Sequence, residues 1–276
     1  MSLSVEIIAM VLVAGLLCGF LNTVASSGSA VSLPILMSIG LHAATANATN
    51  RIPVLVGALA ATVGVMREGV IPWRRALKVA APLALGAAVG ALASEHLPGH
   101  DLRKVIVGAV IVALILIFTK LKKLLNAAGD SEFRFDARTV ALLFAVGIWT
   151  GFIVLDSGTY MLLVLVLAAG LTLVEANIVK NFATLFTTTA AMLVFIQHGN
   201  IDWRAGGIMG LGSLAGGLIG ARIAVSEHAR RWIVGLLVTV IIGELVHLAI
   251  PAHRFNEEFM PAINLYASIL TGRSGS

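Results

Sequence analysis

Two basic residues lie within apolar stretches of this chain, and each is flanked by asparagines. They are Arg51, which follows Asn47 and Asn50, and Lys180, which lies between Asn177 and Asn181. A guanidinium group suits a pair of oxygen atoms, and an ammonium group acts as a point charge. The residue types therefore predict a site for a small anion. The alternative is that Arg51 and Lys180 merely extend along apolar surface to reach a polar interface.

Short polar sequences rich in serine and glycine interrupt the apolar stretches. One break covers residues 22–29 and the other covers residues 156–159. Helix amino ends expose unpaired N–H groups that attract anions, and small residues allow the backbone to approach a ligand. The substrate-binding candidates in the breaks are Ser26, Ser27, Gly28, Ser157 and Gly158. Asp156 is a candidate to carry a coupling proton, or else caps the helix that follows it.

The segments that must hold these residues are apolar enough to span a membrane. The 276 residues are 58% hydrophobic and 12% charged, whereas a soluble domain has about 25% charged residues. The main apolar runs are 5–21, 52–66, 77–93, 105–119, 140–155, 178–196, 206–224 and 233–250. They show little alternation of period two, so we expect helices rather than barrel strands. The fold class is an all-α, polytopic transmembrane bundle of about 8 to 10 spans.

The chain contains an internal repeat. Gly15, Gly19 and Phe20 align with Gly147, Gly151 and Phe152, and after a two-residue gap one constant offset relates the two halves. The equivalent pairs include Ser27-Gly28 with Ser157-Gly158, Ala46-Asn47 with Ala176-Asn177, and Trp73-Arg74 with Trp203-Arg204. We expect a first transmembrane repeat at 1–121, a polar linker at 122–138, a second repeat at 139–250 and a C-terminal tail at 251–276. Each repeat has a short apolar piece after its break, at 30–40 or 160–170. Paired short segments are typical of transporters with broken or re-entrant helices.

The positions of basic residues favour inverted repeats. In the first repeat they gather at 67–78, and in the linker at 120–138. In the second repeat they gather at 222–231 rather than at the loop 198–204, which is equivalent to the first cluster. Because basic residues mark cytoplasmic loops, this shift favours opposite orientations of the two repeats. A parallel arrangement with four spans per repeat is the alternative.

Glycines spaced by four residues predict close helix packing. They occur at Gly86 and Gly90 and again at Gly212, Gly216 and Gly220. We expect these faces to pack within the chain, with a homodimer interface as the alternative. The single cysteine, Cys18, excludes a disulfide within the chain. We also expect His42 to lie in a turn and Glu175 to lie at the start of a helix; Glu244 is expected near a packed interior.

No sequence motif indicates an enzyme, a metal site or a cofactor. The chain has no zinc-protease, nucleophile-elbow or phosphate-loop pattern, and its seven histidines are scattered. The net charge of +5 lies in short loops, which indicates topology rather than nucleic-acid binding. The expected partners are a small anionic substrate and the lipid bilayer.

The two glycine-rich first helices, each followed by a polar break and a short apolar piece, resemble the sulfite exporter TauE/SafE family, also called the 4-toluene sulfonate uptake permease family. The resemblance covers about residues 15–248. It implies a secondary transporter of a sulfur-containing anion, such as sulfite, sulfoacetate or another organosulfonate, in the bacterial cytoplasmic inner membrane. The alternative is a channel or carrier for a different small anion, such as a carboxylate. The family's first break usually reads Gly-x-Gly-Gly-Gly, whereas this chain has Ala-Ser-Ser-Gly-Ser at 25–29.

Overall fold

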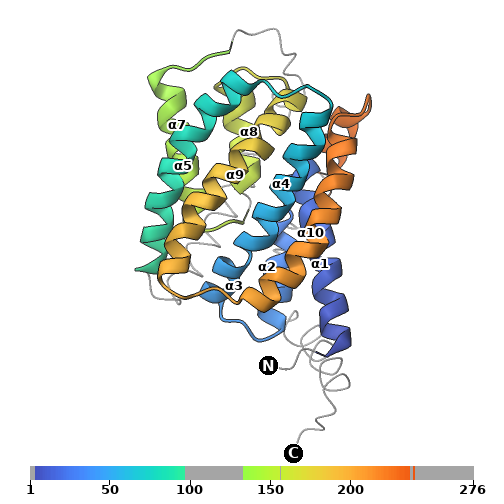
Figure 1. Cartoon of the computed structure of the whole chain (residues 1–276). Helices are drawn as coiled ribbons and strands as arrows, with labels where there is room; N and C mark the ends of the chain where they lie inside the picture. Colours follow the sequence, from blue (N-terminus) through green and yellow to red (C-terminus); the bar gives the residue numbers. More distant parts are fainter. Residues whose placement is uncertain (1–3, 97–132, 156, 237–238, 240–276) are drawn as a thin grey trace, which may run out of the picture.

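The chain folds into a bundle of packed helices (Figure 1). The computed structural model describes residues 4–96, 133–155, 157–236 and 239, and every regular element in these ranges is a helix. Five helical segments in this part are long and apolar enough to cross a membrane: Val5–Val24, Ala43–Arg67, Trp73–Glu95, Leu173–Gln197 and Trp203–Ala224. The expected all-α architecture is confirmed. The predicted runs 105–119 and most of 233–250 lie outside the described residues, as does Glu244.

The helices follow the same order in the two halves of the chain. The first half contains α1 (Val5–Val24), α2 (Ser29–Ser38), α3 (Ala43–Thr49), α4 (Arg51–Arg67) and α5 (Trp73–Glu95). The second half contains α7 (Ala137–Phe152), α8 (Ser157–Leu167), α9 (Leu173–Gln197) and α10 (Trp203–Ala224). The offset of the sequence repeat aligns the helical segment Ala43–Arg67 with α9 from its first residue to its last. In Figure 1 the chain rises through α1, α4 and α10 and descends through α5, α7 and α9.

The turns between helices also repeat. Gly40 and Gly170 both have positive φ, as do Gly69 and Gly199. The members of each pair are equivalent in the sequence repeat, and only glycine adopts this conformation without strain. These equivalent glycines therefore end a helical segment in each half.

Polar side chains define where several helices begin. Ser4, Asp136, Thr172 and Asp202 each accept a hydrogen bond from a backbone N–H in the first turn of the following helix. This contact satisfies a donor that has no partner within the helix. His42 directly precedes α3, and Glu175 lies in the first turn of α9, as predicted.

Glycines allow the two halves to interlock. A Cβ added at Gly15 or Gly19 of α1 would overlap the backbone of α10, at Met209 or Ser213. In the same way, a Cβ at Gly86 or Gly90 of α5 would overlap the backbone of α7. The first helix of each half therefore packs on the last long described helix of the other half. Tight glycine packing within the chain is confirmed, and a homodimer interface stays a prediction.

The first break begins later than the sequence indicated, and the second begins earlier. The first lies at 25–28, because α1 continues to Val24, and the second begins at Ile153, directly after α7. Ser157 and Gly158 thus belong to the first turn of α8, so the predicted break 156–159 was placed too late. The helices that follow, α2 with 10 residues and α8 with 11, rise only about 15 Å and cannot cross a bilayer alone.

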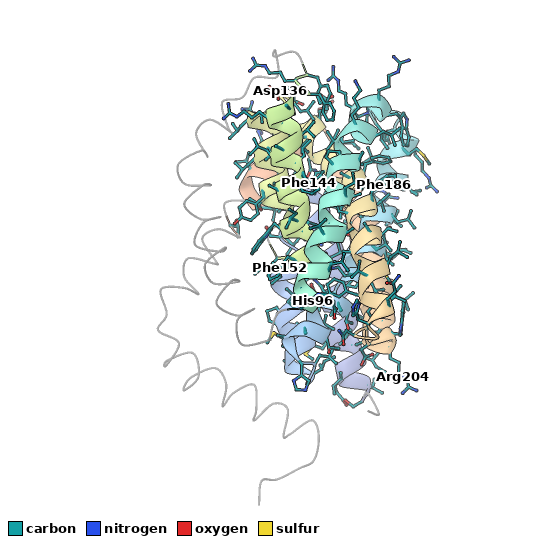
Figure 2. The ribbon with its side chains drawn as sticks, turned by 90° about the vertical axis from the view of Figure 1, so that its left-hand side faces the viewer. His96, Asp136, Phe144, Phe152, Phe186 and Arg204 are labelled. Carbon is teal, nitrogen blue, oxygen red and sulfur yellow. The ribbon has the colours of Figure 1, made fainter. Side chains whose placement is uncertain are left out.

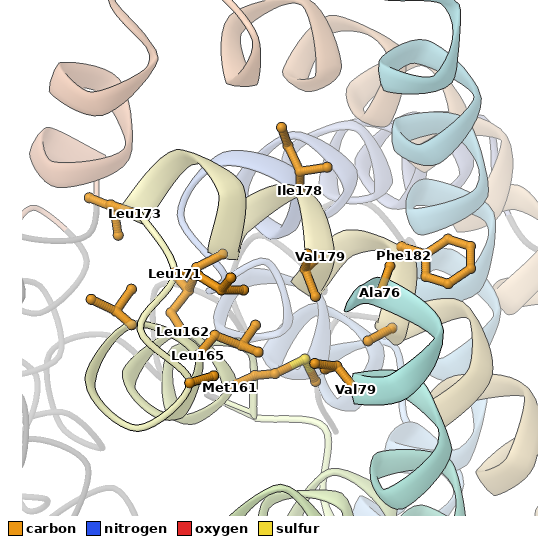
Figure 3. Packing of buried hydrophobic residues seen from close by; sticks show 14 of the residues in the cluster. Ala76, Val79, Met161, Leu162, Leu165, Leu171, Leu173, Ile178, Val179 and Phe182 are labelled. Atoms are coloured by element: carbon orange, nitrogen blue, oxygen red, sulfur yellow. The ribbon is translucent and has the colours of Figure 1, made fainter. Parts of the chain in front are cut away.

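Apolar side chains hold α8 in place. Met161, Leu162 and Leu165 of α8 belong to a buried cluster that includes Val179 of α9 and Val79 of α5. Figure 3 shows Met161 beside Val79, with Leu162 and Leu165 close to Leu171 at the turn before α9. The short helix is therefore fixed between long helices from both halves.

The glycine packing makes a direct prediction for Gly151 of α7, where an added Cβ would overlap the backbone of Ala87. Gly151→Ala should destabilise the protein by about 1 to 3 kcal/mol, because the helices cannot move apart without losing other contacts. Thermal unfolding in detergent should show a melting temperature lower by several degrees. Gly207→Ala is the control, because nothing lies within 4 Å of a Cβ at that position of α10. Equal stability of the two variants would contradict the packing.

Candidate functional site

Lys180 of α9 reaches across to the end of α1 in the other half of the chain. Its Nζ donates hydrogen bonds to the carbonyl oxygen of Asn22 at 2.6 Å and to Oγ of Ser26 at 2.9 Å. Ser26 has φ +68°, a rare value for a residue with a side chain. This turn ends α1 and places the serine hydroxyl beside the ammonium group.

The two asparagines beside Lys180 bind the same helix end. Asn177 and Asn181 each donate a hydrogen bond of 3.0 Å to the carbonyl oxygen of Thr23. The last carbonyls of a helix have no partner within it and carry partial negative charge. Helix α9 therefore supplies the donors that cap the carboxyl end of α1.

Arg51, in the first half, caps the carboxyl end of α7, in the second half. Its Nη1 and Nη2 donate to the carbonyl oxygens of Thr150 at 2.5 Å and Gly151 at 2.7 Å. Asn47 donates to the carbonyl of Phe152 at 3.1 Å, and Figure 2 shows Phe152 at the opposite end of α7 from Asp136. The guanidinium carbon also lies 5.3 Å from the centre of the Phe195 ring. Each half of the chain thus caps the broken helix of the other half.

A small cavity lies where the two breaks meet. A Cβ added at Gly158 would lie 2.6 Å from Cβ of Ser26, so the start of α8 directly contacts the first break. The cavity is lined by residues of both breaks and of α4, α8 and α9: Asn22, Thr23, Ser26, Val54, Ala58, Val154, Ser157, Gly158, Lys180, Asn181 and Thr184. Its volume is about 20 Å³. That space holds a water molecule, so the cavity must widen to admit a larger anion.

The structure brings together only part of the predicted set. Ser26, Ser157, Gly158, Lys180 and Asn181 line the cavity. The other predicted residues do not line it: Arg51, Ser27, Gly28, Asn47, Asn50 and Asn177. Asp156 lies outside the described residues.

The predicted residues that do not line the cavity have other partners. Ser27 Oγ donates to the carbonyl of Ala25 at 3.0 Å, and the N–H of Gly28 donates to Asn22 Oδ1 at 2.9 Å. Asn50 binds two hydroxyl groups of the opening of α2, on Ser29 and Ser32. These bonds hold the first break in shape.

Six cavity residues were not among the predicted site residues: Asn22, Thr23, Val54, Ala58, Val154 and Thr184. Thr184 follows Lys180 by one helical turn and so shares its face of α9, which was a usable signal. Asn22 and Thr23 lay within the predicted break. Val54, Ala58 and Val154 carry no polar group, and nothing in the sequence distinguishes them from other apolar residues.

The cavity wall carries a positive charge that contacts with the described residues leave uncompensated. Lys180 is 1% exposed and Arg51 is fully buried, and within the described part of the chain neither forms an ion pair with a carboxylate. Carbonyl and hydroxyl groups solvate a cation but do not neutralise it. Because burying an ion costs several kcal/mol after relaxation, a nearby anion would be strongly favoured. Lys180 lines the cavity, so its charge faces the space that a small anion would occupy.

The long apolar helices of the bundle and its buried cations are those of a multi-pass membrane protein. Comparison with known proteins identifies its family. The family model "Sulfite exporter TauE/SafE" matches residues 11–245. The chain belongs to this family, and it is a membrane transporter.

Similar proteins carry transporter names. The chain is 28% identical over 252 residues to "Probable membrane transporter protein ORF9" of Sinorhizobium sp, which covers 91% of this chain and 96% of that protein. It is 26% identical over 214 residues to "Probable membrane transporter protein YfcA" of Escherichia coli K12, covering 77% and 78% of the two chains. It is 25% identical to a "Probable membrane transporter protein" of Haemophilus influenzae, with 82% and 89% covered. No solved structure matches this chain.

The paired bonds of Arg51 predict that lysine cannot replace it. Arg51→Lys keeps the charge but loses the planar fork that gives one N–H to each of the Thr150 and Gly151 carbonyls. Losing one charge-assisted hydrogen bond should lower stability by about 1.5 to 3 kcal/mol. Thermal unfolding in detergent checks this result. Arg204→Lys is the control, because Arg204 is an exposed residue at the start of α10 (Figure 2). If Arg51→Lys is as stable as the control, the two-carbonyl cap is not important for folding.

Proposed function

We propose that this transporter carries a small sulfur-containing anion and that the cavity beside Lys180 binds it. The observation that supports the proposal is a buried ammonium group at the wall of a cavity between two helix breaks, whose partners among the described residues are neutral. Anion binding would offset the charge that the carbonyl of Asn22 and the hydroxyl of Ser26 leave uncompensated. No nucleotide-binding motif occurs in the sequence, so we propose secondary transport driven by a gradient.

The cavity lining suits an oxyanion on a small organic group. Lys180 and the Ser157 hydroxyl supply polar contacts for oxygen atoms, while Val54, Ala58 and Val154 supply apolar contacts. Sulfite, sulfoacetate and other organosulfonates have this chemistry, and the name of the family agrees with it. Because similar proteins occur in bacteria, we place the transporter in a bacterial cytoplasmic membrane.

We also propose that the two halves are inverted repeats that expose the cavity to one face of the membrane at a time. Three pairs of equivalent helices run in opposite directions in Figure 1: α1 and α7, α4 and α9, and α5 and α10. The reciprocal caps by Arg51 and Lys180 support the same arrangement. Because the cavity holds little more than a water molecule, transport requires an opening motion at the breaks.

Inversion predicts opposite exposure of equivalent turns. Single cysteines can be introduced at Pro72 and Asp202, which directly precede α5 and α10, in a Cys18→Ser background. A membrane-impermeant thiol reagent should label one position from outside the cell and the other only in inverted vesicles. Labelling of both positions from the same face would contradict inversion.

The proposed substrate class predicts selective stabilisation of the purified protein. Sulfite, thiosulfate or sulfoacetate should raise the melting temperature, whereas acetate and other carboxylates should not. Lys180→Gln should weaken binding of the stabilising anion by roughly 10-fold to 150-fold, because a charge-assisted hydrogen bond contributes about 1.5 to 3 kcal/mol. Isothermal titration measures the change.

Lys78→Gln is the matched control for Lys180→Gln, because Lys78 is an exposed lysine on α5. It should bind the anion with the affinity of the unaltered protein. Stabilisation by carboxylates alone would overturn the sulfur assignment. Unchanged affinity in Lys180→Gln would overturn the site itself.

A further inference from the structure

We propose that Arg51 forms a second site for the transported anion, which replaces the Lys180 site when the cavity opens toward the other face of the membrane. The inference rests on the proposed function. It concerns an oxyanion that passes from the ammonium of Lys180 to the guanidinium of Arg51 during transport.

The centre of the cavity is built from equivalent residues of the two halves. Val54 of α4 and Thr184 of α9 are equivalent positions of the repeat, and both line it. Asn22 and Val154 each follow an equivalent glycine, Gly19 or Gly151, by three residues, and both line it as well. The cavity thus lies on the approximate symmetry axis between the two halves.

The other lining residues are not symmetric: Thr23, Ser26 and Ala58 come from the first half, and four residues come from the second half. Lys180, Asn181, Ser157 and Gly158 line the cavity, whereas their equivalents Asn50, Arg51, Ser27 and Gly28 do not. Inverted repeats exchange conformations in alternating access. After such an exchange, the four first-half equivalents, which include Arg51, should line the cavity. The four second-half residues, which include Lys180, should leave it.

Two buried polar atoms outside the cavity lining lack a hydrogen-bond partner among the described residues. They are Arg51 Nε and Thr188 Oγ1. Both residues are fully buried, and Thr188 is equivalent to Ala58, which lines the cavity. Buried polar groups are normally satisfied, and an unpaired one costs about 1 to 3 kcal/mol. A donor and a hydroxyl that lack partners in this conformation are therefore available to an anion in the other.

The two cations also differ in how tightly they are held. Arg51 gives two N–H groups to helix carbonyls and packs on the Phe195 ring, whereas Lys180 binds one carbonyl and one hydroxyl at the cavity wall. This difference is what a symmetric pair would show when one site is open and the other is closed. When the two halves exchange conformations, Arg51 should lose its bonds to the helix carbonyls, and Lys180 should become as tightly bound as Arg51 is now.

The test compares two cysteines at equivalent positions. Thr188→Cys and Ala58→Cys are each made in a Cys18→Ser background and exposed to a negatively charged methanethiosulfonate reagent, in right-side-out and in inside-out vesicles. The cysteine at position 58 should react from one face and the cysteine at position 188 from the opposite face. Sulfoacetate should slow both reactions by about tenfold or more, as expected for an anion held by a charge-assisted hydrogen bond.

Variants of the two cations decide between a ligand site and a purely structural role. Arg51→Gln should remove the protection by sulfoacetate at position 188 and leave it at position 58, and Lys180→Gln should do the reverse. If Arg51→Gln does not fold, Arg51→Lys should retain partial protection at position 188. No reaction at position 188 from either face, or full protection there in Arg51→Gln, would overturn the second site. If sulfoacetate still protects both positions in Lys180→Gln, the proposed function is overturned instead.

Discussion

Breaking a helix inside a membrane protein leaves its last carbonyl groups without partners, and the architecture of this chain depends on how those groups are satisfied. Helices α1 and α7 both end within the bundle, where bulk water is not available. The donors come from the opposite half: Lys180 and its neighbouring asparagines bind the end of α1, and Arg51 with Asn47 binds the end of α7. Neither half can complete its own break, so the two halves must fold together.

The glycine faces make this exchange of donors possible. Because α1 packs closely on α10, and α7 on α5, each first helix lies against the other half along its length. The cations then reach carbonyl groups that their own half could not offer. The result is an interior that is both closely packed and positively charged, with a cavity between the breaks. A bundle of this kind has a physical reason to bind an anion before any substrate is considered.

The sequence predicted the elements more accurately than the contacts between them. The constant offset of the repeat aligns Ala43–Arg67 with α9 end to end, and the glycine spacing correctly indicated close packing within the chain. The repeat also drew attention to Arg51 and Lys180. It could not show that each cation binds the other half, because a repeat gives a residue's place in its own half and says nothing about its partners. For the same reason it did not show that Lys180 lines the cavity while Arg51 does not.

The central claim is that the buried ammonium of Lys180 holds the transported anion. Selenite resembles sulfite in charge and shape, and its selenium atom can be located by anomalous diffraction from crystals of the protein soaked in it. The account predicts an anomalous peak in the cavity between the two breaks, with a selenite oxygen within hydrogen-bonding distance of Lys180 Nζ. Selenium bound only at exposed basic residues, with none in the cavity at a saturating concentration, would contradict it.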